Sequence, residues 1–196
     1  IIIGYNMCYS TLIDTPGPNS TTVDLPGDRQ VHFTATKPGL LPTALRAFMQ
    51  ERSRVKKLMQ MHAKGSVNYR TLDARQQAIK TVKNSFYGLL GSSLPFGFEL
   101  IAESVTTFGR VAIQRANDCL GPSYPVRQGD TDSCGIELPA SMPIDEVEAL
   151  CTRLAHEISE KLFNGRLTLV YERQLRPCLI FKKKMYVGYD PSADDL

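Results

Sequence analysis

The feature that most constrains this fold is a pair of long helical patterns separated by a short turn. Residues 40–62 place apolar side chains at helical spacing, at Leu41, Leu45, Phe48, Val55 and Met59. A second apolar stripe follows within residues 72–90, formed by Ile79, Val82, Phe86 and Leu89. Because only the turn at residues 64–71 connects the two patterns, they predict an antiparallel pair of helices.

Polar side chains interrupt or accompany both stripes. Arg52 stands where the first stripe expects another apolar residue, so this cation needs a partner on the packed face. A bound phosphate would serve, and so would Glu51 or Asp73 within the hairpin. On the second helix, Lys80, Asn84 and Tyr87 recur at i, i+4 and i+7 and predict a separate polar stripe.

The net charge of +3 is distributed unevenly along the chain. Residues 37–92 contain eleven Lys and Arg against two acids, which gives +9, whereas residues 1–36 sum to −2 and residues 93–196 to −4. A block this basic indicates a polyanionic partner such as a phosphate-bearing molecule. The alternative interpretation is a basic helix face that is simply solvated.

The remaining segments predict a mixture of strands and helices. We expect a strand at residues 1–13, a variable surface loop at 14–30, a break at 91–98, helices at 100–119 and 143–163, a β-hairpin with Asp130 and Asp132 near its tip, and strands at 166–175 and 178–189. The composite is an α+β fold, in which a helical hairpin is inserted into an antiparallel sheet covered by helices.

The pair Asp130 and Asp132 is the candidate metal site. Residues two apart in a strand point to the same side, so their carboxylates would repel each other unless a cation lay between them. Oxygen ligands at this spacing suit Mg²⁺, which also takes substrate phosphates as ligands. Together with the basic helices they predict metal-assisted phosphoryl transfer, and the alternative is a polar turn.

Several other function classes lack their signatures. The five cysteines are dispersed without a CxxC spacing (Cys8, Cys119, Cys134, Cys151 and Cys178). This pattern argues against a zinc site or a disulfide framework and favours reduced thiols in an intracellular protein. No Walker-type or GxGxxG phosphate loop occurs, and no histidine accompanies a nucleophile signature. No apolar run approaches the roughly 18–20 residues of a membrane helix, so we expect no membrane association.

Three local sequences, in order, resemble family B DNA polymerases, the group of eukaryotic replicative and large DNA-virus enzymes. They are KTVKNSFYG at 80–88, QGDTDS at 128–133 and FKKKMYVG at 181–188. The resemblance extends from residue 1 to about residue 189, and ESVTTFGR at 103–110 is similar to herpesvirus members. It implies palm segments at 1–36 and 93–196 around a two-helix fingers hairpin at 37–92.

The resemblance also implies roles for individual residues. It assigns nucleotide binding to Arg52, Lys80, Asn84 and Tyr87. Arg52 and Lys80 would hold the triphosphate, Asn84 would lie by the sugar, and Tyr87 would lie behind the nascent base pair. Asp130 and Asp132 would be the catalytic residues that hold Mg²⁺. The residues that would contact the primer DNA are Lys182, Lys183, Lys184 and Tyr186. The implied partners are primer–template DNA, dNTPs and a processivity factor, and the implied location is the nucleus.

Two positions depart from the family pattern. Gln128 stands in place of the usual Tyr beside the metal carboxylates, and Met185 replaces the usual Arg. The family's first metal carboxylate and its sugar-selecting Tyr belong just before Ile1, so we expect a fragment that is inactive by itself. The alternative functions are another two-metal nucleic-acid polymerase, which NSFYG argues against, or a non-catalytic nucleic-acid-binding module.

Overall fold

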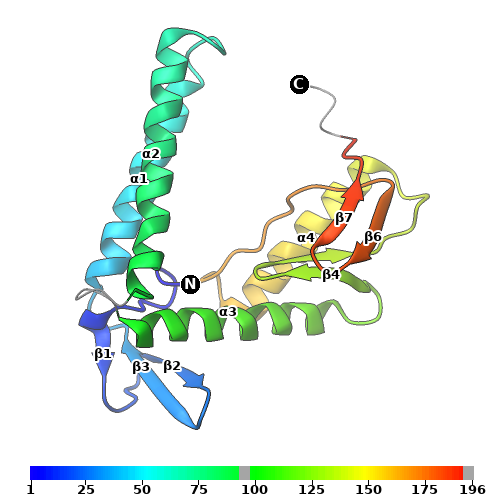
Figure 1. The fold of residues 1–196 in the computed structure, drawn as a ribbon. Coiled ribbons are helices and arrows are strands. Elements are labelled where there is room, and N and C mark those ends of the chain that lie inside the picture. The colour runs from blue at the N-terminus through cyan, green and yellow to red at the C-terminus, as the bar shows by residue number, and fades with distance from the viewer. Residues whose placement is uncertain (93–97, 192–196) are drawn as a thin grey trace. The chain divides into compact units, whose positions relative to one another are not determined.

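A computed structural model describes residues 1–92 and 98–191 of the chain. It divides into two compact units, an N-terminal unit of Ile1–Phe108 and a C-terminal unit of Gly109–Leu196. Within the described residues, helices combine with three small antiparallel sheets, in agreement with the predicted α+β class (Figure 1). The sequence predicted an antiparallel sheet, whereas the described strands form three separate antiparallel sheets and residues 166–175 form no strand. None of the described helices is long and apolar enough to cross a membrane.

The chain begins with turns rather than with the strand predicted at residues 1–13. Only a 3₁₀ helix at Tyr9–Thr11 and the two-residue strand β1 (Leu12–Ile13) are regular in this segment. The reason is Asn6, whose backbone is left-handed with φ 53°. Its side-chain amide donates to the carbonyls of Thr34 (2.7 Å) and Lys37 (2.8 Å), which turns the chain back onto the sheet.

Strands β2 (Ser20–Leu25) and β3 (Arg29–Thr34) form a hairpin where we expected a loop, so the prediction for 14–30 is wrong in its second half. The tight turn at Gly27 and Asp28, both with positive φ, lets Val23 and Leu25 point into the core. Strand β3 also pairs with β1, which gives the sheet order β1-β3-β2.

Helices α1 (Leu40–Met59) and α2 (Val67–Leu90) form the predicted pair and pack side by side (Figure 1). Helix α2 begins five residues earlier than predicted, because the Ser66 hydroxyl accepts a hydrogen bond from the Tyr69 amide and caps the helix. Its apolar face is also rotated from the prediction, since Val82 is 45% exposed whereas Gln76 is buried. Phe86 packs on Phe48 of α1, with ring centroids 5.6 Å apart.

The core of the N-terminal unit lies between its sheet, the start of α1, the end of α2 and the first turns of helix α3 (Glu99–Leu120). Helix α3 agrees with the prediction to within one residue at each end. Its residues Ile101 and Ala102 are buried against the cluster that includes Phe33 and Met7. The predicted break at 91–98 falls mostly outside the described residues.

The C-terminal unit contains the hairpin of β4 (Val126–Asp130) and β5 (Ser133–Ile136) and helix α4 (Ile144–Phe163). Both elements were predicted. Their apolar faces meet around Ala116, Leu120 and Ile158. Helix α4 ends at Asn164, whose backbone is left-handed with φ 48°.

Two strand predictions near the end of the chain are wrong. Residues 166–175 run without a strand partner, because the Leu169 amide is satisfied by the Ser159 hydroxyl at 2.8 Å instead of a ladder carbonyl. The expected single strand at 178–189 is a hairpin of β6 (Cys178–Lys182) and β7 (Met185–Gly188). Its turn is made by Lys183 and Lys184, the latter with φ 65°.

Candidate functional site

Arg52 lies half-buried on α1, on the side that faces α2. Its Nε donates to Oε1 of Gln76 at 3.1 Å, and Nε2 of Gln76 donates to Oδ1 of Asp73 at 2.8 Å. The partner that the sequence required for Arg52 is therefore a neutral amide. In the described part of the chain Arg52 makes no ion pair, so its charge is not neutralised by a protein carboxylate.

Glu51, the other candidate partner of Arg52, is engaged elsewhere. Its two carboxylate oxygens accept from Arg54 at 2.8 and 2.9 Å, and Arg75 of α2 donates to it at 2.7 Å. The hydrogen bond from Arg54 is the largest reason that the pKa of Glu51 lies below its usual value. Because Arg75 and Glu51 are on different helices, this group joins α1 to α2.

The predicted polar stripe of α2 is exposed on one face of the helix. Lys80, Asn84 and Tyr87 all lie at the surface, one turn after another. No polar partner holds the side chain of Lys80 or Asn84 among residues 1–92 and 98–191. The side chains of Lys80 and Asn84 are therefore exposed and have no polar partner among the described residues.

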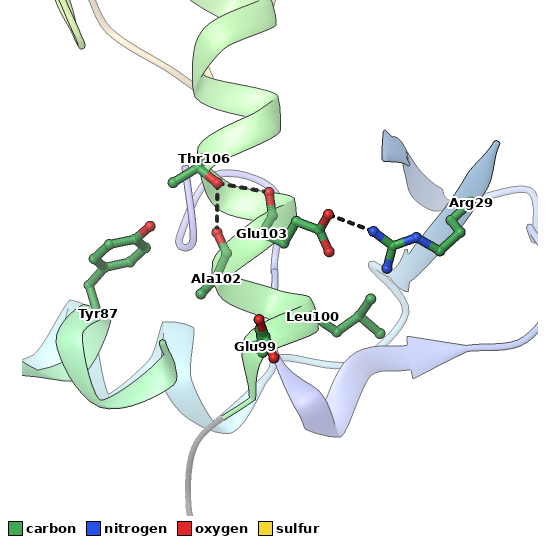
Figure 2. A pocket seen from close by; sticks show the side chains of 7 residues that line it. All are labelled: Arg29, Tyr87, Glu99, Leu100, Ala102, Glu103 and Thr106. Atoms are coloured by element: carbon green, nitrogen blue, oxygen red, sulfur yellow. Dashed lines mark hydrogen bonds and ion pairs between the residues drawn. The ribbon is translucent and has the colours of Figure 1, made fainter. Parts of the chain in front are cut away.

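Tyr87 also lines an open pocket of about 670 Å³ in the N-terminal unit (Figure 2). The other lining residues come from the β2–β3 hairpin and the first turns of α3, namely Arg29, Glu99, Leu100, Ala102, Glu103 and Thr106. Neither Arg29 nor Glu103 was predicted to be a site residue from the sequence. They are 74 positions apart, and no local pattern signals their contact.

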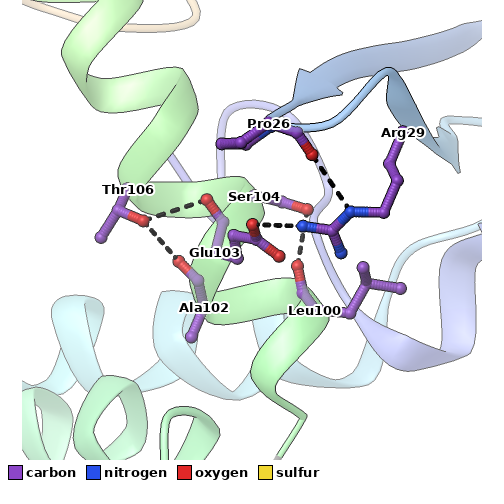
Figure 3. Close-up of polar contacts among 7 residues, drawn as sticks. All are labelled: Pro26, Arg29, Leu100, Ala102, Glu103, Ser104 and Thr106. Carbon is purple, nitrogen blue, oxygen red and sulfur yellow. Dashed lines mark hydrogen bonds and ion pairs between the residues drawn. The ribbon is translucent and has the colours of Figure 1, made fainter.

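Arg29 and Glu103 form an ion pair at the wall of this pocket, with 2.6 Å between Nη2 and Oε1 (Figure 3). Nε of Arg29 also donates to the Pro26 carbonyl at 3.2 Å, which fixes the guanidinium near the hairpin turn. The Thr106 hydroxyl bonds back to the carbonyls of Ala102 and Glu103 and so faces its own helix. The ion pair therefore attaches the β2–β3 hairpin to α3.

In the C-terminal unit, Asp130 and Asp132 lie at the tip of the β4–β5 hairpin. Asp130 is the last residue of β4, whereas Asp132 lies in the turn. The expectation that both point to one side of a strand is wrong, because Thr131 between them has φ 33° and the chain reverses there. The Asp132 amide donates to the Asp130 carbonyl across this residue. A turn, rather than strand alternation, sets the relation of the two acids.

Lys184, a predicted DNA-binding residue, contacts Asp130, a predicted metal ligand. Its Nζ lies 2.9 Å from Oδ1 of Asp130, which also accepts from the Thr131 hydroxyl at 2.9 Å. The pKa of Asp130 is lowered, mainly by the hydrogen bond from Lys184 and then by that from Thr131. The ammonium of Lys184 thus occupies Oδ1 of Asp130.

The remaining predicted DNA contacts lie on the β6–β7 hairpin. Lys182, Lys183 and Tyr186 are all exposed, and the Tyr186 hydroxyl accepts a long hydrogen bond of 3.4 Å from Arg173. The lysines follow one another through the end of β6 and its turn. This edge therefore presents a concentrated positive charge to the solvent.

The donor chemistry of the acidic turn fits Mg²⁺. Across the described ranges no three His, Cys, Asp or Glu side chains gather in a way that could hold a metal ion. Asp130 and Asp132 nevertheless supply carboxylate oxygens, and Mg²⁺ is commonly held by one or two carboxylates together with substrate phosphates and water. A substrate phosphate would complete such a site.

Comparison with known proteins gives consistent matches. The sequence matches the family described as DNA polymerase family B over residues 1–195. It is 31% identical to the DNA polymerase delta catalytic subunit of Plasmodium falciparum, over 96% of this chain and 19% of that protein. It is 32% identical to DNA polymerase 1 of Pyrococcus abyssi, over 97% of this chain and 24% of that protein.

Among solved structures, the family B DNA polymerase of the archaeon Pyrobaculum calidifontis superposes with a TM-score of 0.64 at 25% identity. The alignment covers 97% of this chain and 24% of the archaeal chain. The chain therefore spans about a quarter or less of the length of these relatives.

Proposed function

The chain belongs to DNA polymerase family B, and from this membership we propose that it supplies nucleotide-binding and metal-binding parts of a DNA-directed DNA polymerase. Residues 37–92 would be the fingers, and residues 1–36 and 93–196 would belong to the palm. The observation that carries the proposal is the exposed face of α2, which presents Lys80, Asn84 and Tyr87. Among the described residues, Lys80 and Asn84 have no polar side-chain partner.

The hairpin of α1 and α2 binds the incoming dNTP in this proposal. Arg52 offers a planar fork and Lys80 a compact charge, and both suit the oxygens of a triphosphate. Asn84 lies one turn beyond Lys80 and contacts the sugar. Tyr87, one turn further, places its exposed ring behind the nascent base pair.

Asp130 and Asp132 are the residues that would hold Mg²⁺. When bound, the metal supplies a Lewis acid that lowers the pKa of the attacking primer 3′-hydroxyl and neutralises the leaving pyrophosphate. Lys184 neutralises Asp130 in the structure, and its ammonium would be able to contact the primer strand if a cation took its place on this carboxylate. Lys182, Lys183 and Tyr186 extend this contact along the primer backbone, which requires no sequence preference.

The partners that follow are primer–template DNA, the four dNTPs and a processivity factor of the whole polymerase. Polymerases named delta and alpha catalytic subunits are among the relatives. On that basis we propose a location in the nucleus, or in the host nucleus if the source is viral.

The test is Asp132→Ala in the full polymerase that carries this sequence. We expect at least a hundredfold loss of primer extension, or roughly 3 kcal/mol in the barrier, with DNA affinity retained. Asp145→Asn, which changes an exposed acid in the first turn of α4, is the matched control and should extend normally. Near-normal extension by Asp132→Ala would refute the assignment and favour a non-catalytic nucleic-acid-binding module.

A further inference from the structure

We propose that Gln76 is a positioning residue for Arg52, and that Asp73 sets the direction of its amide. This inference deepens the proposed function and rests on it, because Arg52 is the residue assigned to the triphosphate. Gln76 was not a candidate in the sequence, where residues 72–90 suggested an apolar packing face of Ile79, Val82, Phe86 and Leu89.

Gln76 is a polar side chain buried between two helices, with only 7% of its surface exposed. Burial of an amide is unfavourable unless its hydrogen bonds are made. Both ends of this amide are engaged, at 3.1 Å by Arg52 and at 2.8 Å by Asp73. The position therefore combines a polar group with a specific pair of partners.

The direction of the amide follows from the chemistry of Asp73. An ionised carboxylate only accepts hydrogen bonds, so the NH₂ group of Gln76 must face Asp73. Its carbonyl oxygen then faces Arg52, which only donates. The reversed amide would set oxygen against oxygen and donor against donor. Asp73, a residue that does not itself bond Arg52, thus orients the group that does.

The consequence for Arg52 is a guanidinium held through Nε alone. Its two terminal nitrogens have no partner in the parts of the chain that the structure describes. These nitrogens are the ones that bind phosphate oxygens as a fork. Gln76 is neutral, so it restrains the side chain without competing with an anion for its charge.

The neighbouring acid, Glu51, is engaged by cations other than Arg52. Glu51 precedes Arg52 in α1 and is bonded to Arg54 and to Arg75. Two separate arrangements therefore preserve the charge of Arg52 for a ligand: an occupied carboxylate beside it and a neutral amide opposite it.

The direct test is the exchange rate of the Arg52 Nε hydrogen in the 196-residue chain, measured by nitrogen-15 NMR. Gln76→Leu keeps the buried volume and removes the acceptor, so exchange should accelerate at least about tenfold. Asp73→Asn leaves the core side chain in place and frees the amide to reverse, so exchange should accelerate to a smaller extent. Gln77→Leu, at the adjacent exposed glutamine, is the matched control and should change nothing.

The functional readout is the affinity of the same variants for inorganic tripolyphosphate. Loss of positioning should weaken binding about threefold to tenfold in Gln76→Leu, as expected when a long side chain must be ordered by the ligand. Gln76→Glu should weaken it as well, because a carboxylate would then compete for the guanidinium. In the polymerase, the KM for dNTP should rise while kcat changes little.

Arg52→Ala separates the two hypotheses. If Arg52→Ala binds tripolyphosphate normally, the proposed nucleotide site is wrong. If Arg52→Ala weakens binding but Gln76→Leu and Asp73→Asn leave both the affinity and the Nε exchange rate unchanged, only the positioning role of Gln76 is wrong.

Discussion

Removal of the Asn6 side chain should strongly destabilise the N-terminal unit, because this one side chain makes three hydrogen bonds to the backbone. Its amide nitrogen donates to the carbonyls of Thr34 and Lys37, and its oxygen accepts from the Gly39 amide at 2.8 Å. Gly39 is the N-cap residue of α1, which has no side chain to cap the helix. Asn6 therefore connects the end of β3 to the start of the helix that carries Arg52.

The expected size of the effect follows from these contacts. Hydrogen bonds contribute about 1 kcal/mol each, and since one of the three is exposed we assign the set about 2.5 kcal/mol. Alanine at φ 53° adds about 1 kcal/mol, because a left-handed backbone is unfavourable for a residue with a Cβ. Asn6→Ala should therefore lower the free energy of unfolding by about 3.5 kcal/mol.

The assay is urea unfolding followed by far-ultraviolet circular dichroism, with amide exchange at Gly39 as a local probe. Asn164→Ala is the matched control: it also has a positive φ, of 48°, but its side chain makes no hydrogen bond in the described residues. We expect that control to lose about 1 kcal/mol. If Asn6→Ala loses no more than Asn164→Ala, the three side-chain hydrogen bonds do not hold the start of α1.

Two further predictions concern the C-terminal unit. Lys184→Met should raise the pKa of Asp130, because the hydrogen bond from Lys184 is the main cause of its lowering; an unchanged pKa in an NMR titration would contradict this. Because the pKa of Asp130 is lowered in the folded state, its ionised carboxylate stabilises the fold at pH values above the unfolded-state pKa. This contribution to the free energy of unfolding is lost as the pH falls through the folded-state pKa. The variant lacks part of the contribution, so its stability should decrease less on acidification. Gly188→Ala should destabilise the β6–β7 hairpin by about 1–3 kcal/mol, because the new Cβ would lie 2.8 Å from Leu175 Cβ and 3.0 Å from the Pro177 carbonyl; unaltered amide exchange in the hairpin would refute this.

The helices were the most predictable part of this fold. Apolar residues recur over many turns in α1, α3 and α4, and such patterns need no knowledge of the partner. The start of α2 was missed because Ser66, next to Gly65, was interpreted as part of a connecting turn, although its hydroxyl caps the helix. A cap and a turn use the same residue types, so the sequence does not separate them.

The strands were predictable only where both partners lie close in the sequence. The β4–β5 hairpin is local and was found, whereas prolines around Ser20–Leu25 suggested a loop and obscured β2. At the start of the chain, the distant contacts of Asn6 override the apolar run. Residues 166–175 have a strand-like composition, but the Leu169 amide donates to the Ser159 hydroxyl instead of to a neighbouring strand.

The same limit applies to the candidate site. The sequence indicated that Arg52 needs a partner, but only the rotation of α2 decides that this partner is Gln76. Likewise, Asp130 and Lys184 were both candidates, yet the contact between them depends on how two hairpins pack. The pattern allowed single candidate residues to be named, whereas it did not predict the pairings across elements.

Thr131 links cation binding to the shape of the acidic turn. A β-branched residue rarely adopts φ 33°, and the hydroxyl of this one donates a hydrogen bond to Oδ1 of Asp130 at 2.9 Å. An ion that bound this oxygen would compete with the Thr131 hydroxyl and with the ammonium of Lys184, which both contact the same atom. Occupation of the carboxylate would therefore be coupled to the backbone of Thr131, a residue that need not contact the ion itself.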